Sequence, residues 1–249
     1  MNIFAITLGF APRRMIAEGM KNYYTTASVK PVQHILLDQH YPLQRDGEPA
    51  LAEIAEQYGL KLVDSGFDRG LHKGFNYAFE NHFDGMTDAD LIIGFDPDSV
   101  VATPGWDVAL RSALERDATL AMATLMNPIS RGELQSRGFT ERVAGDLRYW
   151  ITHQACMGNV SAARVSFLRR TGGLHEPTNY YGHLESTMFG KIREAGMSWA
   201  YLCDYHEADR RGCTTAHDPE YIAYKHAHAH GRYFHGSFAE FLAAGCPTR

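Results

Sequence analysis

The sequence has few cysteines, and their spacing indicates neither a zinc knuckle nor a disulfide framework. Its 249 residues include four cysteines, none in a Cys-x-x-Cys pair, so we expect free thiols at Cys156, Cys203, Cys213 and Cys246. No apolar run approaches the ~20 residues that a membrane-spanning helix needs. The first ten residues also lack the basic flank of a signal peptide. These absences predict a cytoplasmic protein without a transmembrane segment.

An excess of basic charge is absent as well. The chain carries 24 Lys and Arg against 29 Asp and Glu, a formal net charge of -5. This balance argues against a general nucleic-acid binder, whose affinity would depend on a basic surface that releases condensed counterions. A composition of 45% hydrophobic and 21% charged residues is typical of a soluble globular protein and excludes disorder, collagen and coiled coil.

Short apolar segments alternate with helically spaced stretches over the first half of the chain. Such alternation is typical of βα units that form a mostly parallel sheet. The predicted strands are Ile3–Leu8, Val32–Leu37, Leu60–Val63, Leu91–Phe95 and Leu120–Leu125. The predicted helices are Pro12–Tyr24, Pro49–Tyr58, Gly70–Phe83 and Pro104–Arg116. In the third helix, the apolar positions share one face and leave Lys73 and Asn76 on the surface.

The regular alternation stops after the fifth predicted strand. We interpret residues 127–149 as an irregular excursion over the sheet, on the acceptor side. The segments predicted beyond it are an extended stretch Tyr149–Cys156, helices Ala162–Thr171 and Leu184–Ala195, a strand Trp199–Cys203 and a short terminal helix Phe238–Ala244. With no repeat and no linker in the sequence, we predict one domain over residues 1–206 and an extension over residues 207–249 that packs on it.

Two aspartates follow the most apolar predicted strand. Asp96 and Asp98 flank a proline directly after Phe95. In an open parallel sheet, ligands bind outside the carboxyl ends of the strands. Two carboxylates at this spacing can face one divalent cation, and their hard oxygens suit Mg²⁺ or Mn²⁺. The alternative is a loop aspartate that caps the helix predicted near Pro104.

A series of segments, in this order, resembles the GT-A fold glycosyltransferases, most closely family 2. The segments are residues 6–8, 34–38, 68–76, 91–99, 103–106, 169–176 and 182–186, and together they span roughly residues 1–206. The resemblance implies an α/β fold of the GT-A (Rossmann-like) type: a mixed, mostly parallel sheet flanked by helices, here with a C-terminal helical extension. It also implies transfer of a sugar from a nucleoside diphosphate sugar, with UDP favoured, to an acceptor hydroxyl.

The resemblance implies roles in donor binding for five residues. Thr7 and Asp38 correspond to positions that hold the nucleotide base, and Arg69 and Lys73 lie in the segment that approaches the base and the phosphates. Asp96 would face the ribose. Two of these residues also have ordinary structural interpretations, because Asp38 could end its strand by accepting backbone hydrogen bonds and Lys73 could be a solvent-facing helix residue.

The resemblance also implies a metal site and a catalytic base. Asp98, with Asp96, would bind Mn²⁺ or Mg²⁺, and His206 corresponds to a further ligand that would favour manganese. The competing histidines are His217, His226, His228 and His230, although a solvated tail explains the last three better. Glu185 corresponds to the base that takes the proton of the acceptor, so transfer would invert the anomeric configuration. The family commonly has Glu-Asp here, whereas this chain has Glu185-Ser186; the helix dipole alone would also favour Glu185.

Two other functions and several acceptors stay open at this point. A nucleotidyltransferase that makes a nucleotide sugar would carry a glycine-rich loop after the first strand, but residues 8–12 contain one glycine. A non-catalytic nucleotide-binding module is compatible with the altered Glu-Asp position. The acceptor could be a glycan, a lipid-linked sugar, a protein or a modified nucleic-acid base, the last ranked low. Tyr149, Trp150 and the pair Tyr180-Tyr181 are candidates for acceptor contact, although Trp150 is also a candidate for the core.

Overall fold

A large mixed sheet organises the chain. The structure, a computed structural model, describes residues 1–43, 45–126, 131–152, 160–174, 184–208, 219–229 and 236–246. Within them the strands are β1 Ile3–Gly9, β2 Gln33–Asp38, β3 Lys61–Asp64, β4 Leu91–Phe95, β5 Val100–Val101, β6 Leu120–Met126, β7 Thr140–Ala144, β8 Leu147–Thr152, β9 Val160–Arg164 and β10 Ser198–Ala208. The helices are α1 Arg13–Thr26, α2 Leu51–Tyr58, α3 Leu71–Asn81, α4 Trp106–Arg116, α5 Arg131–Ser136, α6 Val165–Thr171, α7 Leu184–Glu194, α9 Pro219–Ala229 and α10 Phe238–Ala243.

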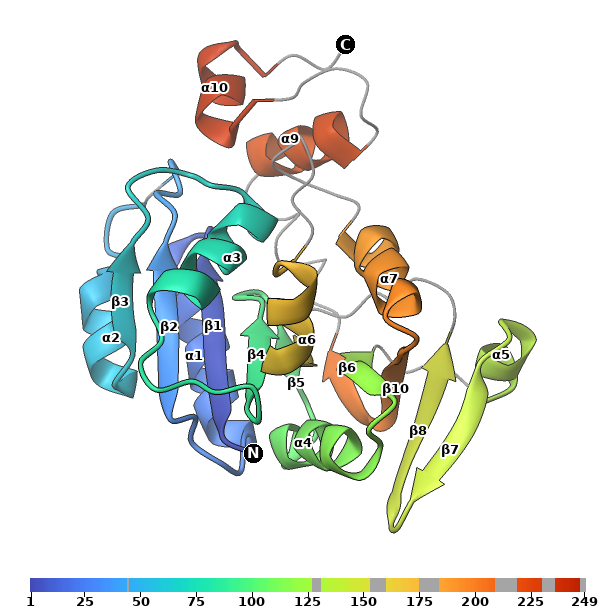
Figure 1. Ribbon diagram of the computed structural model, residues 1–249. Coiled ribbons are helices and arrows are strands. Elements are labelled where there is room, and N and C mark those ends of the chain that lie inside the picture. The colour runs from blue at the N-terminus through green and yellow to red at the C-terminus, as the bar shows by residue number, and fades with distance from the viewer. Residues whose placement is uncertain are drawn as a thin grey trace.

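The strands lie in the order β3-β2-β1-β4-β9-β6-β10-β8-β7, and β5 pairs with β10 (Figure 1). Strands β1 to β4 are parallel to one another, and β6 is parallel to β10. Strand β9 runs antiparallel between β4 and β6, and β8 runs antiparallel beside β10. The mostly parallel mixed sheet predicted from the sequence is therefore confirmed.

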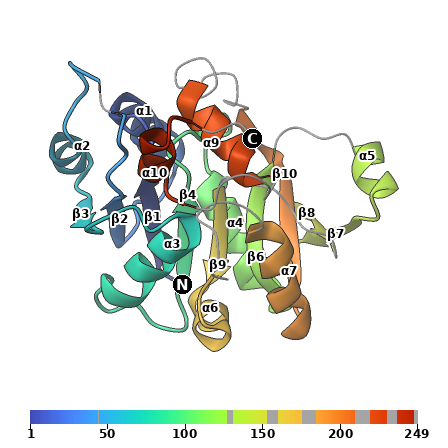
Figure 2. The same cartoon turned by 90° about the horizontal axis from the view of Figure 1, so that it is seen from above.

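Alternate residues of the central strands face two hydrophobic cores, one on each side of the sheet. In β1, Ile3 and Ala5 join the core formed with α1, α2 and α4, whereas Phe4 and Ile6 join the core under α3, α6 and α7. Figure 2 shows α1 on one side of the sheet and α3 and α6 on the other. Because both faces are covered, the strands consist of continuous apolar runs instead of alternating patterns.

The second half of the chain differs from the sequence-based prediction. The excursion predicted over residues 127–149 is wrong for the described part, which contains α5 and a β7–β8 hairpin closed by Gly145 and Asp146. The start of the helix predicted from Ala162 is also wrong, because residues 162–164 belong to β9 and the helix begins at Val165. Strand β9 lies between β4 and β6. Its hydrogen bonds to these two strands favour the extended conformation over the helix that its alanines would otherwise prefer.

The histidine-rich tail is more ordered than predicted. Residues 219–229 form α9, so the solvated tail expected around His226 and His228 is wrong for the backbone of these residues, whereas His230 lies outside the described residues. Tyr224 and Ala227 of this helix are buried. None of the described helices is both long enough and apolar enough to cross a membrane.

Candidate functional site

The strand order has a switch point at the carboxyl ends of β1 and β4. From β1 the chain adds β2 and β3 on one side and then places β4 on the other. In open α/β sheets, ligands bind at such a switch point, where the loops after two neighbouring strands separate. Gly9 pairs with Asp38, which pairs with Asp64, so the ends of these three strands are level. The pairing of Ile6 with Gly94 brings Asp96 to the same edge.

Helix α1 packs closely against the turn that contains Asp96 and Asp98. The Asp96 carbonyl accepts a hydrogen bond from the Ser99 amide at 2.9 Å, which closes the turn. Both carboxylates are half-buried, and Pro97 between them is buried. Helix α1 approaches this turn so closely that a Cβ atom at Gly19 would collide with the Pro97 carbonyl oxygen. Position 19 therefore requires glycine for the turn to keep its place.

Helix α1 also forms hydrogen bonds with β5, the strand that follows the turn. The Asn22 side chain of α1 accepts from the Val101 amide at 2.7 Å and donates to the Val101 carbonyl at 3.1 Å. Val101 also pairs with Glu207 at the end of β10. This pairing places the backbone of His206 next to the strand that continues from the two aspartates. Residues distant in sequence are thus brought to one edge of the sheet.

The close approach of α1 to Pro97 leads to a prediction about stability. We expect Gly19→Ala to lower the free energy of unfolding by about 1–3 kcal/mol, because the backbone must move to admit the methyl group. Gly190→Ala in α7 is the matched control, since a Cβ there meets no atom within 4 Å. That change should raise stability by about 0.5–1 kcal/mol, through the higher helix propensity of alanine. Urea denaturation of both variants measures the difference, and equal stabilities would contradict the close contact.

The chemistry of the aspartate pair fits a hard divalent cation. Asp96 and Asp98 offer carboxylate oxygens, the ligands that Mg²⁺ and Mn²⁺ accept most readily. Among the described residues, no group of three His, Cys, Asp or Glu side chains gathers to form a complete metal site. The His206 side chain lies outside the described part of the structure, although its backbone is in β10. The described residues therefore supply two ligands of a candidate site.

Thr7 lies within the sheet, and its hydroxyl already has a partner. Thr7 is fully buried, and its Oγ1 lies 3.0 Å from Nε2 of His34, whose Nδ1 lies 3.0 Å from the Tyr24 hydroxyl. Burial lowers the pKa of His34 to about 3, so the ring is neutral at physiological pH. A neutral ring has one N–H, so one of the two hydroxyls donates to it. In this arrangement, the Thr7 side chain contributes to the packing of β1 on β2.

Asp38 ends β2 at the carboxyl edge of the sheet. Its Oδ1 accepts from the His40 amide at 2.8 Å, and its carbonyl accepts from the Ser65 amide at 3.1 Å and the Ser65 hydroxyl at 2.6 Å. Asp38 therefore makes the backbone hydrogen bonds that the structural interpretation expects. Asp38 is half-buried, so its side chain is partly open to solvent at this edge.

Arg69 and Lys73 have different environments, although both lie near the start of α3. The Arg69 guanidinium stacks between two rings, 4.3 Å from the centroid of Phe67 and 3.9 Å from that of Tyr77. Its Nε also donates to the Ser65 carbonyl at 3.0 Å. A contact between Arg69 and a phosphate would require the side chain to leave these partners. Lys73 is exposed and has no such constraint.

Two buried polar residues fix α3, and the sequence pattern identified neither. Asn76 is buried, which corrects its predicted surface position: it donates to the Leu174 carbonyl and accepts from the Leu174 amide, both at 2.8 Å. Gln39 is also buried, and its Oε1 accepts from the Arg69 amide at 3.3 Å. A Cβ at Gly74 would lie 2.5 Å from the same oxygen. The sequence held no local signal for either residue, because the helical pattern places Asn76 off the apolar face and Gln39 lies in a loop.

Three of the solved structures that resemble this chain are glycosyltransferases. The mannosyltransferase PcManGT from Pyrobaculum calidifontis, in complex with GDP-Man and Mn²⁺, matches 98% of this chain and 69% of its own, with a TM-score of 0.61 and 19% identity. GalNAc-T7 with UDP, GalNAc and Mn²⁺ matches over 83% of this chain and 43% of its own, with a TM-score of 0.59 and 11% identity. S. aureus TarS 1–349 in complex with UDP-GlcNAc matches over 92% and 67%, with a TM-score of 0.54 and 11% identity.

This chain has the GT-A fold. The fold expected from the ordered segments of the sequence is thereby confirmed. No protein-family model matches the sequence, and no curated protein matches it. At the identities found, the likeness establishes the architecture, and the chain spans less than half of GalNAc-T7.

The remaining sequence-based candidates are those for the base, for acceptor contact and for a further metal ligand. Glu185 is the second residue of α7, although its side chain lies outside the described part, as do Tyr180, Tyr181 and His217. Tyr149 and Trp150 are buried in β8, at 2% and 3% exposure, so the core interpretation holds for Trp150 and neither ring is available to stack on a sugar. Trp106 and Trp199 are core residues as well.

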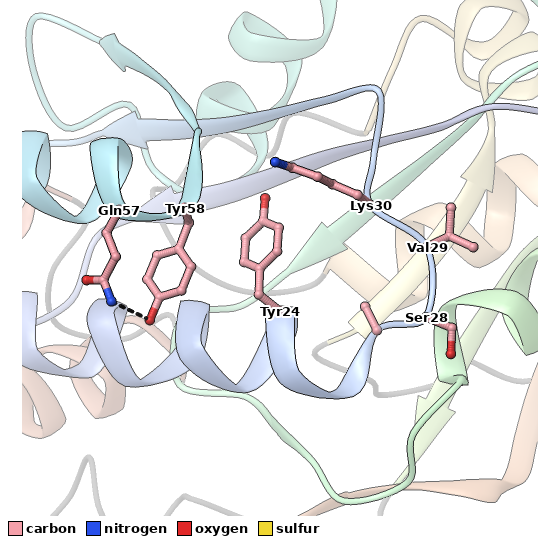
Figure 3. A pocket seen from close by; sticks show the side chains of 7 residues that line it. Tyr24, Ser28, Val29, Lys30, Gln57 and Tyr58 are labelled. Atoms are coloured by element: carbon pink, nitrogen blue, oxygen red, sulfur yellow. Dashed lines mark hydrogen bonds between the residues drawn. The ribbon is translucent and has the colours of Figure 1, made fainter.

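A separate hollow lies at the opposite edge of the GT-A sheet. It has a volume of about 390 Å³ and lies between the ends of α1 and α2, before β2 and β3 begin (Figure 3). The rings of Tyr24 and Tyr58 stack in its wall at a centroid distance of 5.3 Å, and Lys30 reaches across it. Because it is at the amino ends of the strands, it is separate from the candidate site at Asp96.

Proposed function

We propose that this protein is a metal-dependent glycosyltransferase that moves a sugar from a nucleoside diphosphate sugar to an acceptor hydroxyl. The proposal rests mainly on one observation: the turn with Asp96 and Asp98, which packs against α1, lies at the β1–β4 switch point of a GT-A fold. The carboxylates alone are a common pattern, and the fold alone hosts several activities. Together they support a metal site, because ligands in open α/β sheets bind at the carboxyl ends of the strands.

The donor is proposed to lie along the carboxyl edge from β2 to β4. Asp38 and the end of β1 near Thr7 would meet the base, Asp96 the ribose, and Arg69 and Lys73 the base and the diphosphate. We favour a UDP-sugar as donor. Among the neighbours, GalNAc-T7 and TarS contain UDP or UDP-GlcNAc, whereas PcManGT contains GDP-Man, so GDP is the alternative.

Asp98 and Asp96 would hold the cation, and the backbone position of His206 beside β5 supports that residue as a further ligand. A divalent cation supplies positive charge that stabilises the negative charge developing on the leaving diphosphate. A histidine ligand favours Mn²⁺ over Mg²⁺, and two of the neighbours contain Mn²⁺.

Glu185 is proposed as the base. An acceptor hydroxyl is a poor nucleophile at neutral pH, and a carboxylate within hydrogen-bond distance takes its proton during the attack. The position of Glu185 in the first turn of α7 supports this role. Direct attack on the anomeric carbon then inverts its configuration.

Calorimetric titration of UDP, GDP, CDP and dTDP, with and without Mn²⁺, tests the proposal. We expect one diphosphate, UDP first, to bind only when Mn²⁺ is present. The corresponding donor sugars then become substrates for turnover assays with acceptor mixtures. If no diphosphate binds under either condition, the glycosyltransferase proposal fails.

A further inference from the structure

The C-terminal helices pack over the carboxyl edge of the sheet and not on either of its faces. Figure 1 shows α9 and α10 above the upper end of the sheet, and Figure 2 shows them across it from above. They form a third hydrophobic core, here called the C-terminal cluster, whose buried members are Tyr41, Tyr221, Tyr224, Ala227, Phe238 and Phe241. This cluster is separate from the two cores that flank the sheet.

The C-terminal cluster joins α10 to the loops that follow β1 and β2. Phe10 directly follows β1, and its ring lies 5.3 Å from Tyr41 and 6.3 Å from Phe238, measured between centroids. Tyr41 follows β2 and lies 5.7 Å from Phe238. These two loops border the edge where the base of the donor is proposed to bind. The position of α10 thus affects the loops at that end of the proposed donor site.

One carboxylate, that of Asp68, binds the first turns of two helices. Asp68 lies in the loop between β3 and α3, and its Oδ1 accepts from the Gly70 amide at 2.8 Å. Gly70 precedes α3 with φ +75°, a conformation that favours glycine. The Asp68 carboxylate also accepts from the amide of Phe238, the first residue of α10. A carboxylate between two helix N-termini is favourable because both carry partial positive charge.

The capping box of α10 supplies no hydrogen-bond acceptor for the Phe238 amide. Its N-cap, Ser237, accepts from the Glu240 amide at 3.3 Å, and Glu240 in turn accepts from the Ser237 amide at 2.7 Å. This reciprocal pair occupies the amides of Ser237 and Glu240. The Phe238 amide instead depends on Asp68, which belongs to a different element. The hydrogen bond therefore ties the short helix to the loop that leads into α3.

We infer that Asp68 is a positioning residue, which docks α10 over the base end of the donor site and thereby increases affinity for the donor nucleotide. The inference rests on the proposed function and adds a determinant of donor affinity to it. Asp68 is followed by Arg69 and, within α3, by Lys73, both proposed to approach the donor. The Asp68 carboxylate accepts from the Phe238 amide of α10 and from the Gly70 amide just before α3. Docking of α10 is therefore coupled to the positions of Arg69 and Lys73.

Protonation provides a readout that is specific to Asp68. Burial is the main cause that raises the pKa of Asp68 to about 6, and the negative charge of Glu240 on α10 adds to it. Nearby, Arg69 directs its guanidinium to Phe67 and Tyr77, and Lys73 of α3 is exposed. An exposed aspartate has a pKa near ~4, so the docked state binds the proton more tightly than the undocked state. Protonation of Asp68 therefore stabilises the docked state of α10. This stabilisation is fully present below pH ~4 and is lost as the pH rises through 6.

Hydrogen exchange of the full chain, together with calorimetry, tests the inference. In Asp68→Ala, we expect the amides of residues 238–243 to exchange roughly tenfold faster or more, because the Phe238 amide loses its side-chain acceptor. We expect the Kd for the diphosphate in the presence of Mn²⁺ to rise at least about fivefold. In the wild-type protein, protection of α10 should increase from pH 8 to pH 5 after correction for intrinsic exchange, and Asp68→Ala should lose this dependence.

Two further variants separate docking from general instability. Ser237→Ala weakens the cap of α10 without touching the Asp68 loop, and it should also speed exchange of α10 and raise the Kd. Asp88→Ala removes an exposed aspartate that pairs with Arg169 at 2.7 Å before β4, and it should change neither value. Unchanged exchange of the β1 and β4 amides in Asp68→Ala would show that the sheet is intact.

The outcomes distinguish the inference from the proposed function. If the wild-type protein binds a diphosphate but Asp68→Ala binds it equally well, or if exchange of α10 does not change, the inference is overturned and the proposed function stands. If the wild-type protein binds no diphosphate, the proposed function fails and the inference fails with it. Faster exchange of α10 together with weaker binding, in both Asp68→Ala and Ser237→Ala, supports the inference.

Discussion

Replacement of Asp98 by alanine is expected to abolish Mn²⁺-dependent binding of the nucleoside diphosphate, with an affinity loss of more than roughly 100-fold. Removal of an outer partner of a metal ligand already costs ~10–100-fold in metal affinity, and a ligand itself contributes more. The turn is braced by Gly19 and Asn22 of α1, so we expect the backbone to keep its place when one side chain is shortened. Calorimetric titration of the diphosphate with and without Mn²⁺ measures the effect.

Asp146→Ala is the matched control for this variant. Asp146 is an exposed aspartate at the turn of the β7–β8 hairpin, where it pairs with Arg116 at 2.6 Å. An exposed ion pair contributes little, so binding and stability should hardly change. Metal-dependent binding that survives in Asp98→Ala would overturn the assignment of Asp98 as a ligand. Equal losses in both variants would point to a general effect of the substitutions.

Replacement of Glu185 by glutamine is expected to lower the rate of sugar transfer by ~10²–10⁴-fold, with little effect on donor affinity. A positioned general base contributes a factor of this size, and glutamine keeps the shape of the side chain but cannot take the proton. Release of the diphosphate from the donor sugar, measured with and without acceptors, gives the rate of transfer. Calorimetry on the same variant gives the affinity.

Glu194→Gln tests whether any glutamate of α7 gives the same result. Glu194 is exposed at the last residue of that helix, so both rate and affinity should stay at the wild-type level. A wild-type rate of transfer in Glu185→Gln would remove that residue from the role of base. If donor hydrolysis is slow and equal in the wild-type protein and Glu185→Gln, and neither transfers sugar, the non-catalytic module becomes the better explanation.

Strands β1, β2 and β4 were predictable because each is buried on both faces, whereas the two-residue strand β5 was not predicted. Strand β4 was predicted with its observed bounds, Leu91–Phe95, and β1, β2 and β3 were predicted within one residue at each end. A strand covered by helices on both sides must be apolar along its whole length, so the pattern stands out in the sequence. The aspartate pair was visible for the same reason, since it ends such a run abruptly.

The contacts around the candidate site were much less predictable. Asn76 shares its helix with exposed polar residues, and only the approach of Leu174, almost a hundred positions away, makes it a buried hydrogen-bonding residue. The need for glycine at position 19 likewise comes from Pro97 on another element. Nothing local distinguishes Asp68 from an ordinary loop aspartate until α10 places the Phe238 amide beside it.

The sequence alone determined the α/β class, the order of the βα units in the first half and the presence of a carboxylate pair after an apolar strand. These features depend on hydrophobic periodicity and on residue types close together in the chain, which are local properties. Only the tertiary structure decided that β9 is a strand, that α1 braces the aspartate turn and that α9 and α10 cover the carboxyl edge. Each of these depends on hydrogen bonds or packing between segments distant in sequence, and such contacts exist only after the chain has folded.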